Sequence, residues 1–112
     1  VEKVYYPGLK SHEGHDIAAR QMADFGGMMS FEVKGGRAAG AKLVNSLHLV
    51  TVAVSLGDAE TLIEHPASMT HSTYTEEELA ASGIAAGLIR LSAGLENAED
   101  IIADLKQALD QL

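Results

Sequence analysis

An arginine inside an otherwise apolar run is the residue of this chain with the clearest chemical potential. Arg90 lies in the segment GLIRLSAG (residues 87–94), where a strand would place it on one face with Leu88 and Ser92. Its guanidinium is a planar fork that matches the two oxygens of a carboxylate, which a lysine ammonium does not. The residues alone leave two alternatives open, a carboxylate-binding arginine in a cleft or a charge on a solvated strand face.

A second concentration of polar chemistry is the run VSLGDAETLIEHPASMTHSTY (residues 54–74), which is rich in hydroxyl and imidazole groups. Ser55, Asp58 and His65 are the residue types of a hydrolytic triad. The strained GxSxG turn of such enzymes is missing, however, and two of the three residues lie three positions apart in one turn. A serine hydrolase is therefore set aside.

The histidines give little support for a metal centre. His12 and His15 in HEGH are spaced so that one helix could bring both to one metal, but no third ligand follows and Gly14 weakens a helix there. His65 and His71 flank a loop without helical register. The chain has no cysteine, which excludes disulfides, thiolate nucleophiles and thiolate metal sites. We expect no metal site.

Composition restricts the partners and the setting. The 112 residues are enough for one domain with a real core and too few for two. The net charge of −8 would repel nucleic acid and anionic membranes, and no apolar run is long enough to span a bilayer. We expect neither kind of partner. The lack of cysteine fits a reducing, cytoplasmic setting.

These residues must be positioned by an alternation of strands and helices. Two-residue periodicity and β-branched residues predict strands at 1–6, 29–33, 49–54 and 88–93. Helical spacing predicts helices at 12–23 and 38–47, a short helix at 58–63, a helix at 75–82 and a last helix from Asn97. The order predicts an α+β fold (α/β in looser naming), with a mostly antiparallel sheet of about four strands covered on one side by helices.

Two helix boundaries carry specific signals. Thr75 followed by Glu78 is a capping box, and Gly83 is a helix stop. In the last helix, Asn97 with Asp100 forms the cap. Its expected buried stripe consists of Ile101, Leu105, Ala108 and Leu112.

Five segments, which together cover nearly the whole chain, resemble a known family. They are YPGLKSHEGHDIAARQM, FGGMMSFEVKGG, VSLGDAETLIEHPASMTHS, YTEEELAASGI and GLIRLSAGLENAEDIIADL. In this order they are similar to the C-terminal domain of the pyridoxal-phosphate-dependent Cys/Met metabolism enzymes, the cystathionine γ-synthase-like family. Val54 stands where cystathionine-handling members tend to have Glu, so within the family the chain most resembles the methionine γ-lyases. Ala93 departs from the usual Val.

The resemblance implies a domain organisation. Residues 1–112 would be a single C-terminal substrate-binding domain of a fold-type I enzyme, and the large domain that binds pyridoxal phosphate would be absent from this chain. The family's aldimine lysine lies far upstream, and none of the lysines here has its sequence context. The resemblance therefore implies that the fragment alone binds no cofactor, contains no catalytic residue and is inactive.

The resemblance also implies an activity and residue roles. The full-length parent would be a carbon–sulfur lyase, a cytoplasmic homotetramer that converts L-methionine to methanethiol, 2-oxobutanoate and ammonia. Arg90 would bind the α-carboxylate of the amino-acid substrate with help from Ser55, Thr70 would support Ser55, and Val54 and Leu56 would flank the site. The alternatives are an O-acetylhomoserine sulfhydrylase, a cystathionine γ-lyase or γ-synthase, a homocysteine desulfhydrase, or a stand-alone binding module without catalysis.

Overall fold

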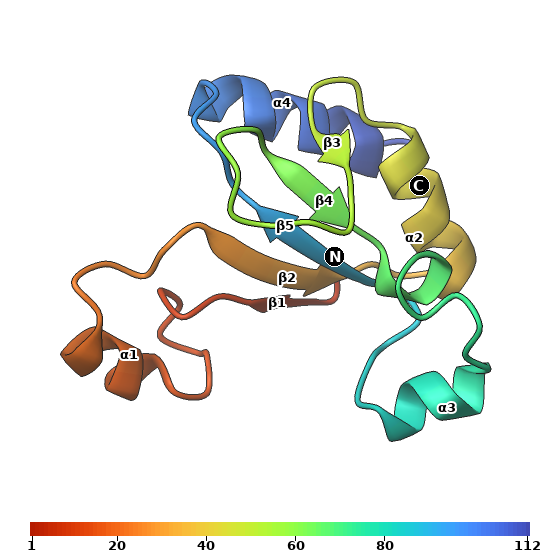
Figure 1. Ribbon diagram of the computed structural model, residues 1–112, viewed down its shortest axis with the longest axis horizontal. Helices are drawn as coiled ribbons and strands as arrows, with labels where there is room; N and C mark the ends of the chain where they lie inside the picture. Colours follow the sequence, from red (N-terminus) through yellow and green to blue (C-terminus); the bar gives the residue numbers. More distant parts are fainter.

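A five-stranded sheet forms the centre of the molecule. The computed structural model describes residues 1–112. The strands are β1 (Lys3–Tyr5), β2 (Met28–Glu32), β3 (Thr51–Val52), β4 (Leu62–Glu64) and β5 (Leu88–Ser92), in the spatial order β1-β2-β5-β4-β3 (Figure 1). Only the β3–β4 pairing is parallel. The predicted α+β class with a mostly antiparallel sheet is confirmed.

One face of this sheet is covered by two helices, α2 (Gly36–Asn45) and α4 (Ala98–Leu109) (Figure 1). Side chains from both helices, from alternate positions of β2, β4 and β5, and from residues next to β2 and β3 form a single buried core: Phe31, Val33, Leu43, Val44, Val50, Ile63, Ile89, Leu91, Ile101 and Ala108. Because successive strand residues point to opposite faces, Arg90 lies on the face that these helices leave uncovered.

The other helices lie outside this layer. Helices α1 (His15–Gln21) and α3 (Glu76–Ala81) project at opposite ends of the molecule, and the short 3-10 helix η1 (Pro66–Ser68) precedes α3 (Figure 1). The predicted capping box of α3 is present, since Thr75 and Glu78 exchange side-chain and backbone hydrogen bonds. The helix ends just before Gly83, whose φ of +73° suits glycine. No helix of the molecule has both the length and the apolar character needed to cross a membrane.

The predicted short helix at 58–63 is wrong. Asp58 bonds the backbone N–H of Glu60 at 3.2 Å, which makes a turn, and Leu62–Glu64 then form β4 between β3 and β5. All three residues of β4 are buried. A strand buried on both faces shows no polar–apolar alternation, so its sequence pattern does not distinguish it from a short helix.

The predicted stripe of the last helix is correct in its first part and wrong at its end. Ile101 and Ala108 are buried and Leu105 packs against the core, but Leu112 lies beyond the helix and is 47% exposed. Asp104 is buried on this face instead. Asn97 caps the helix as predicted, with its side chain accepting a hydrogen bond from the Glu99 N–H, but the side chain of Asp100 takes no part in the cap.

Candidate functional site

Four polar side chains form a row across the uncovered face of the sheet. The strand registers place Tyr5 opposite Ser30, Ser30 opposite Arg90, and Arg90 opposite Glu64. These residues come from β1, β2, β5 and β4 in turn. Directly opposite residues on neighbouring strands have side chains close enough to interact. The row therefore brings together residues that are distant in sequence, with Arg90 near its centre.

Arg90 is held by one nitrogen of its guanidinium. Its Nη2 donates to the backbone carbonyl oxygens of Val54, at 2.6 Å, and Ser55, at 3.3 Å. The same nitrogen lies 3.0 Å from Oε2 of Glu64. The structure thus places Arg90 beside Ser55, but the contact is with the main chain and not with the hydroxyl. Its side chain keeps 27% of its surface exposed, so the guanidinium remains accessible.

Glu64 is the site residue that the sequence reasoning missed. Only 2% of its side chain is exposed, and its Oε1 is buried without any hydrogen-bond partner. A buried carboxylate requires a positive or donating partner, and Arg90 provides the only one. One feature of the sequence could have indicated Glu64: residues 62–64 (LIE) are an apolar, strand-like run that ends in an acid.

The loop that crosses from β3 to β4 carries Ser55 and is tied to the end of β5. The Ser92 hydroxyl accepts from the Gly57 N–H at 2.8 Å, and the Leu95 N–H donates to the Ala59 carbonyl at 2.7 Å. This close approach requires glycine at 94, because a Cβ there would lie 2.3 Å from the Ala59 carbonyl oxygen. The loop is therefore fixed over the uncovered face next to Arg90.

A carboxylate fixes the far end of the same loop. Glu96 accepts two bonds of 2.6 Å from Thr61, one from its hydroxyl and one from its N–H. These bonds lower the pKa of Glu96 below its usual value, and the bond from the hydroxyl has the larger effect. The Thr61 hydroxyl in turn accepts from the Gly94 N–H at 2.9 Å. Glu96 stays ionised and supports the loop that carries Ser55.

The remaining predicted site residues lie on or near this loop. Val54 and Leu56 are each 53% exposed, although they are large apolar residues, and Ser55 is exposed between them. Thr70 is exposed, and its hydroxyl is hydrogen-bonded to the His71 ring and not to Ser55. The structure therefore brings Arg90, Val54 and Ser55 together and leaves the supporting role of Thr70 a prediction.

The histidines have structural environments. His65 is fully buried, with ring nitrogens 2.7 Å from the Ser68 hydroxyl and 2.8 Å from the Ala86 carbonyl. His15 bonds the Pro7 carbonyl at 2.7 Å and stacks on Phe25. No three histidine, aspartate or glutamate residues are grouped so that they could hold a metal ion.

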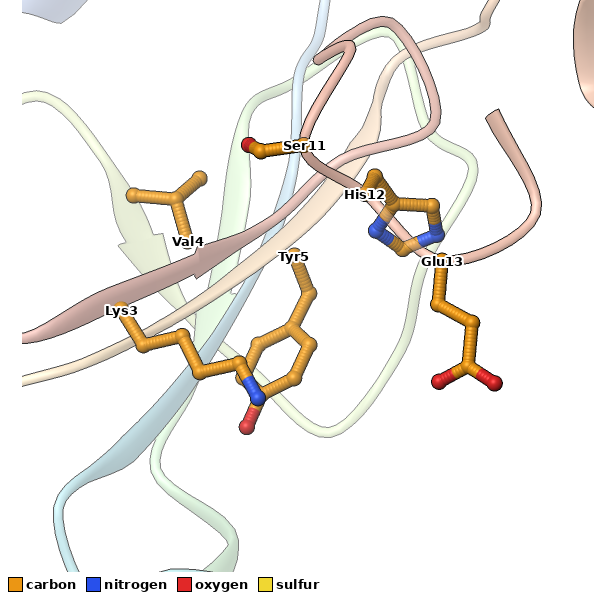
Figure 2. A pocket seen from close by; sticks show the side chains of 6 residues that line it. All are labelled: Lys3, Val4, Tyr5, Ser11, His12 and Glu13. Atoms are coloured by element: carbon orange, nitrogen blue, oxygen red, sulfur yellow. The ribbon is translucent and has the colours of Figure 1, made fainter. Parts of the chain in front are cut away.

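The largest cavity, about 430 Å³, lies at the edge of the sheet beside β1. Figure 2 shows Lys3 and Tyr5 extending side by side from this strand, with Ser11, His12 and Glu13 on the following turn. The Lys3 amine lies 4.6 Å from the centre of the Tyr5 ring, and the Tyr5 hydroxyl donates to Glu32. The cavity is lined by no part of the loop that carries Ser55.

The lysines of this chain do not fit a pyridoxal phosphate site. All five, at positions 3, 10, 34, 42 and 106, are exposed. Lys42 donates to the Gln111 carbonyl at 2.5 Å, and Lys106 pairs with Asp110. A lysine that binds a carbonyl cofactor works in a desolvated pocket where its pKa can fall, and none of the five has such surroundings.

Comparisons with known proteins agree with the resemblance. The family model for "Cys/Met metabolism PLP-dependent enzyme" matches residues 1–110. An L-methionine γ-lyase of Fusobacterium nucleatum subsp. polymorphum is 65% identical over 112 residues, which are all of this chain and 28% of that protein. A cystathionine β-lyase of Lactococcus lactis subsp. cremoris is 52% identical over 111 residues, covering 99% of this chain and 29% of that protein.

A solved structure gives the same result for the fold. Cystathionine γ-synthase from Xanthomonas oryzae pv. oryzae, in complex with aminoacrylate and cysteine, superimposes with a TM-score of 0.88 at 54% identity. The match covers 99% of this chain and 29% of that one. The chain thus spans under a third of the length of these relatives. It belongs to the family of pyridoxal-phosphate-dependent enzymes of Cys/Met metabolism.

Proposed function

We propose that residues 1–112 are the C-terminal, substrate-binding domain of a methionine γ-lyase. The full-length protein would convert L-methionine to methanethiol, 2-oxobutanoate and ammonia, and this domain would be inactive alone. The observation that carries the proposal is the accessible guanidinium of Arg90, held beside the loop of Val54 and Ser55 on the uncovered face of the sheet.

The proposed roles follow from what each group can do at this place. Arg90 binds the α-carboxylate of the substrate, since an arginine fork matches that group. The exposed Ser55 adds a hydrogen bond from the neighbouring loop. Val54 and Leu56, which are each 53% exposed beside Ser55, provide an apolar wall for the thioether side chain. Thr70 supports Ser55, the role that the resemblance implies.

Pyridoxal phosphate would act from the part of the protein outside this chain, where it withdraws electrons from the bound amino acid. The residues described here would orient the substrate and exclude water. Correct placement of a reacting group accounts for large factors in rate, and a small misplacement can cost on the order of 100-fold. A domain without catalytic residues can therefore still control the rate.

Val54 favours methionine over cystathionine as the substrate. Cystathionine carries a charged amino-acid group at the far end of its side chain, whereas methionine ends in a methyl group. An exposed valine next to the carboxylate-binding arginine offers a surface for the methyl end and no partner for a charged one. The similarity to a cystathionine β-lyase makes turnover of cystathionine the alternative that the experiment must separate.

The test is turnover by the full-length protein with L-methionine, cystathionine, homocysteine and O-acetylhomoserine supplied separately. We expect 2-oxobutanoate and methanethiol from methionine, at the highest kcat/KM of the four. Turnover of cystathionine alone would contradict the role given to Val54. A reading frame that encodes only these 112 residues would instead favour a stand-alone binding module. We also expect the full-length protein to be a cytoplasmic homotetramer, which light scattering and cell fractionation would check.

A further inference from the structure

We propose that Glu64 is a positioning residue for Arg90, which fixes the guanidinium in the orientation that receives the substrate carboxylate. This inference rests on the proposed function, because it assigns the partner that orients the carboxylate-binding arginine. Glu64 itself would touch no part of the substrate, since only 2% of its side chain is exposed.

The geometry makes Glu64 the fixed member of the pair. It lies in β4 directly opposite Arg90 of β5, with Oε2 at 3.0 Å from Nη2. Its side chain is enclosed, whereas that of Arg90 is 27% exposed and has more rotatable bonds. A short, buried side chain on a central strand therefore restrains a long, accessible one.

The pair is poorly arranged for stability alone. Oε1 of Glu64 is buried without a partner, and such an atom loses the hydrogen bonds that water would provide. Buried ion pairs are in general weak contributors to stability because desolvation offsets the attraction. A buried acid with one unpaired oxygen is therefore better explained by what it does to Arg90 than by the stability that it adds.

The contacts of Arg90 show why a second restraint is needed. A guanidinium can bind a carboxylate at two points along either of two edges, and Nη2 belongs to both edges because Cδ blocks the third. Here Nη2 faces three acceptors, the carbonyl oxygens of Val54 and Ser55 and the carboxylate of Glu64. The substrate carboxylate must therefore displace one acceptor, and the 3.3 Å contact with Ser55 is the longest. Glu64 keeps the guanidinium from turning while this contact is exchanged.

The experiment uses the full-length protein and compares Glu64→Ala with Glu64→Gln. We expect Glu64→Ala to raise KM for L-methionine about tenfold and to change kcat less than about twofold. The variant loses the charge-assisted hydrogen bond that orients Arg90 for binding of the substrate. Glu64→Gln retains an acceptor for Nη2 and should stay within about threefold of wild type.

A carboxylate-free probe separates positioning from general damage. The amine 3-(methylthio)propylamine has the side chain of methionine without its carboxylate, so its inhibition constant should not change in Glu64→Ala. Glu60→Ala, at an exposed acid on the loop that leads into β4, is the matched control and should leave both constants unchanged. If Glu64→Ala does not fold, Glu64→Asp provides the test, because it keeps the charge but withdraws the carboxylate by one methylene and should still raise KM.

The outcomes distinguish this inference from the proposed function. If Arg90→Lys leaves KM for methionine unchanged, the proposed function fails. If Arg90→Lys raises KM but Glu64→Ala (or Glu64→Asp) behaves as wild type, the function stands and the positioning role is overturned. An equal loss of methionine and amine binding in the Glu64 variants would also overturn it, since that result indicates structural damage.

Discussion

At the scale of single residues, the three arginines of the chain differ in what their guanidinium groups contact. Arg37 donates to the carbonyls of Ala67 and Tyr74 and pairs with Glu76 at 2.9 Å, so it ties the start of α2 to the segment before α3. Arg20 is exposed in the last turn of α1, where a positive charge interacts favourably with the helix dipole. Only Arg90 is both restrained and accessible on the uncovered face of the sheet.

Arg90→Lys in the full-length protein should therefore lower kcat/KM for L-methionine by about 10- to 100-fold, the range expected when a charged hydrogen bond is lost. A lysine keeps the positive charge but cannot bind a carboxylate at two points. Arg20→Lys is the suitable control and should change kcat/KM less than twofold. Arg37 is less suitable, because its substitution would disturb the contacts between α2 and the segment before α3. Steady-state kinetics check this prediction, and equal small losses in both variants would remove Arg90 from the site.

The sequence identified Arg90 but not its partner, and the reason is physical. A charged residue in an apolar strand is visible locally, because the strand pattern of GLIRLSAG depends only on neighbouring residues. Glu64 acquires its role through a pairing between strands that are distant in sequence. The pattern of residues 58–63 is consistent with a helix. The sequence therefore does not show on which face of the sheet Glu64 lies, nor which strand pairs with it.

At the scale of elements, a carboxylate joins α4 to the segment that precedes β3. Asp104 of α4 accepts hydrogen bonds from the N–H groups of His48, Leu49 and Val50, at 2.8–2.9 Å for the shortest to each. Gln107 adds a fourth, at 3.0 Å. The carboxylate thus satisfies three backbone donors that no strand pairing satisfies, and it does so from the buried face of the helix.

The pKa of Asp104 reflects two opposing effects. Burial raises it, but the bonds from Val50, His48, Leu49 and Gln107 together outweigh burial and hold the pKa below the usual value. A folded-state pKa that is depressed means that the carboxylate stabilises the fold above its unfolded pKa, near 4, and that this contribution is lost as the pH falls through the folded value.

Asp104→Asn should accordingly lower the free energy of unfolding by about 1–3 kcal/mol at neutral pH, because the amide presents one acceptor to several donors. The difference from wild type should begin to shrink below about pH 4, where the aspartate of the unfolded chain becomes protonated, and should vanish only as the pH falls through the lower pKa of the folded state. Urea unfolding at pH 7 and pH 3 measures both effects. Asp110→Asn, at an exposed acid paired with Lys106 on the same helix, should cost less than about 1 kcal/mol. Equal losses in the two variants at neutral pH would contradict the special role of Asp104.

Elements with regular local patterns were predictable, and those defined by long-range pairing were not. The capping box at Thr75 and the alternation around Phe31 are properties of a few consecutive residues. The burial of Asp104, by contrast, breaks the rule that the buried stripe of a helix is apolar, and only its three backbone donors explain it. Its position between Ile101 and Ala108 was the available signal.

At the scale of the whole molecule, the sheet has helices on only one face (Figure 1). The strand registers place the row of Tyr5, Ser30, Arg90 and Glu64 on the other face. The exposed apolar side chains of Val54 and Leu56 lie on the loop beside this row. We therefore expect a site with one wall, an arginine for a carboxylate and no lysine in a desolvated pocket to hold part of an amino acid without binding a carbonyl cofactor covalently at one defined position.

The isolated chain should therefore form no specific adduct with pyridoxal phosphate and should release no methanethiol from L-methionine. Because its five lysines are all exposed, borohydride reduction should label several of them at low occupancy, whereas the full-length protein should be labelled at one lysine outside these 112 residues. Absorbance spectra, together with peptide mass mapping after reduction, would measure this. Free lysine at the matched amine concentration is the control for non-specific reaction. One equivalent of cofactor on a single lysine of the isolated chain would contradict the division of labour proposed here, because it would show that this domain holds the cofactor as well as the substrate.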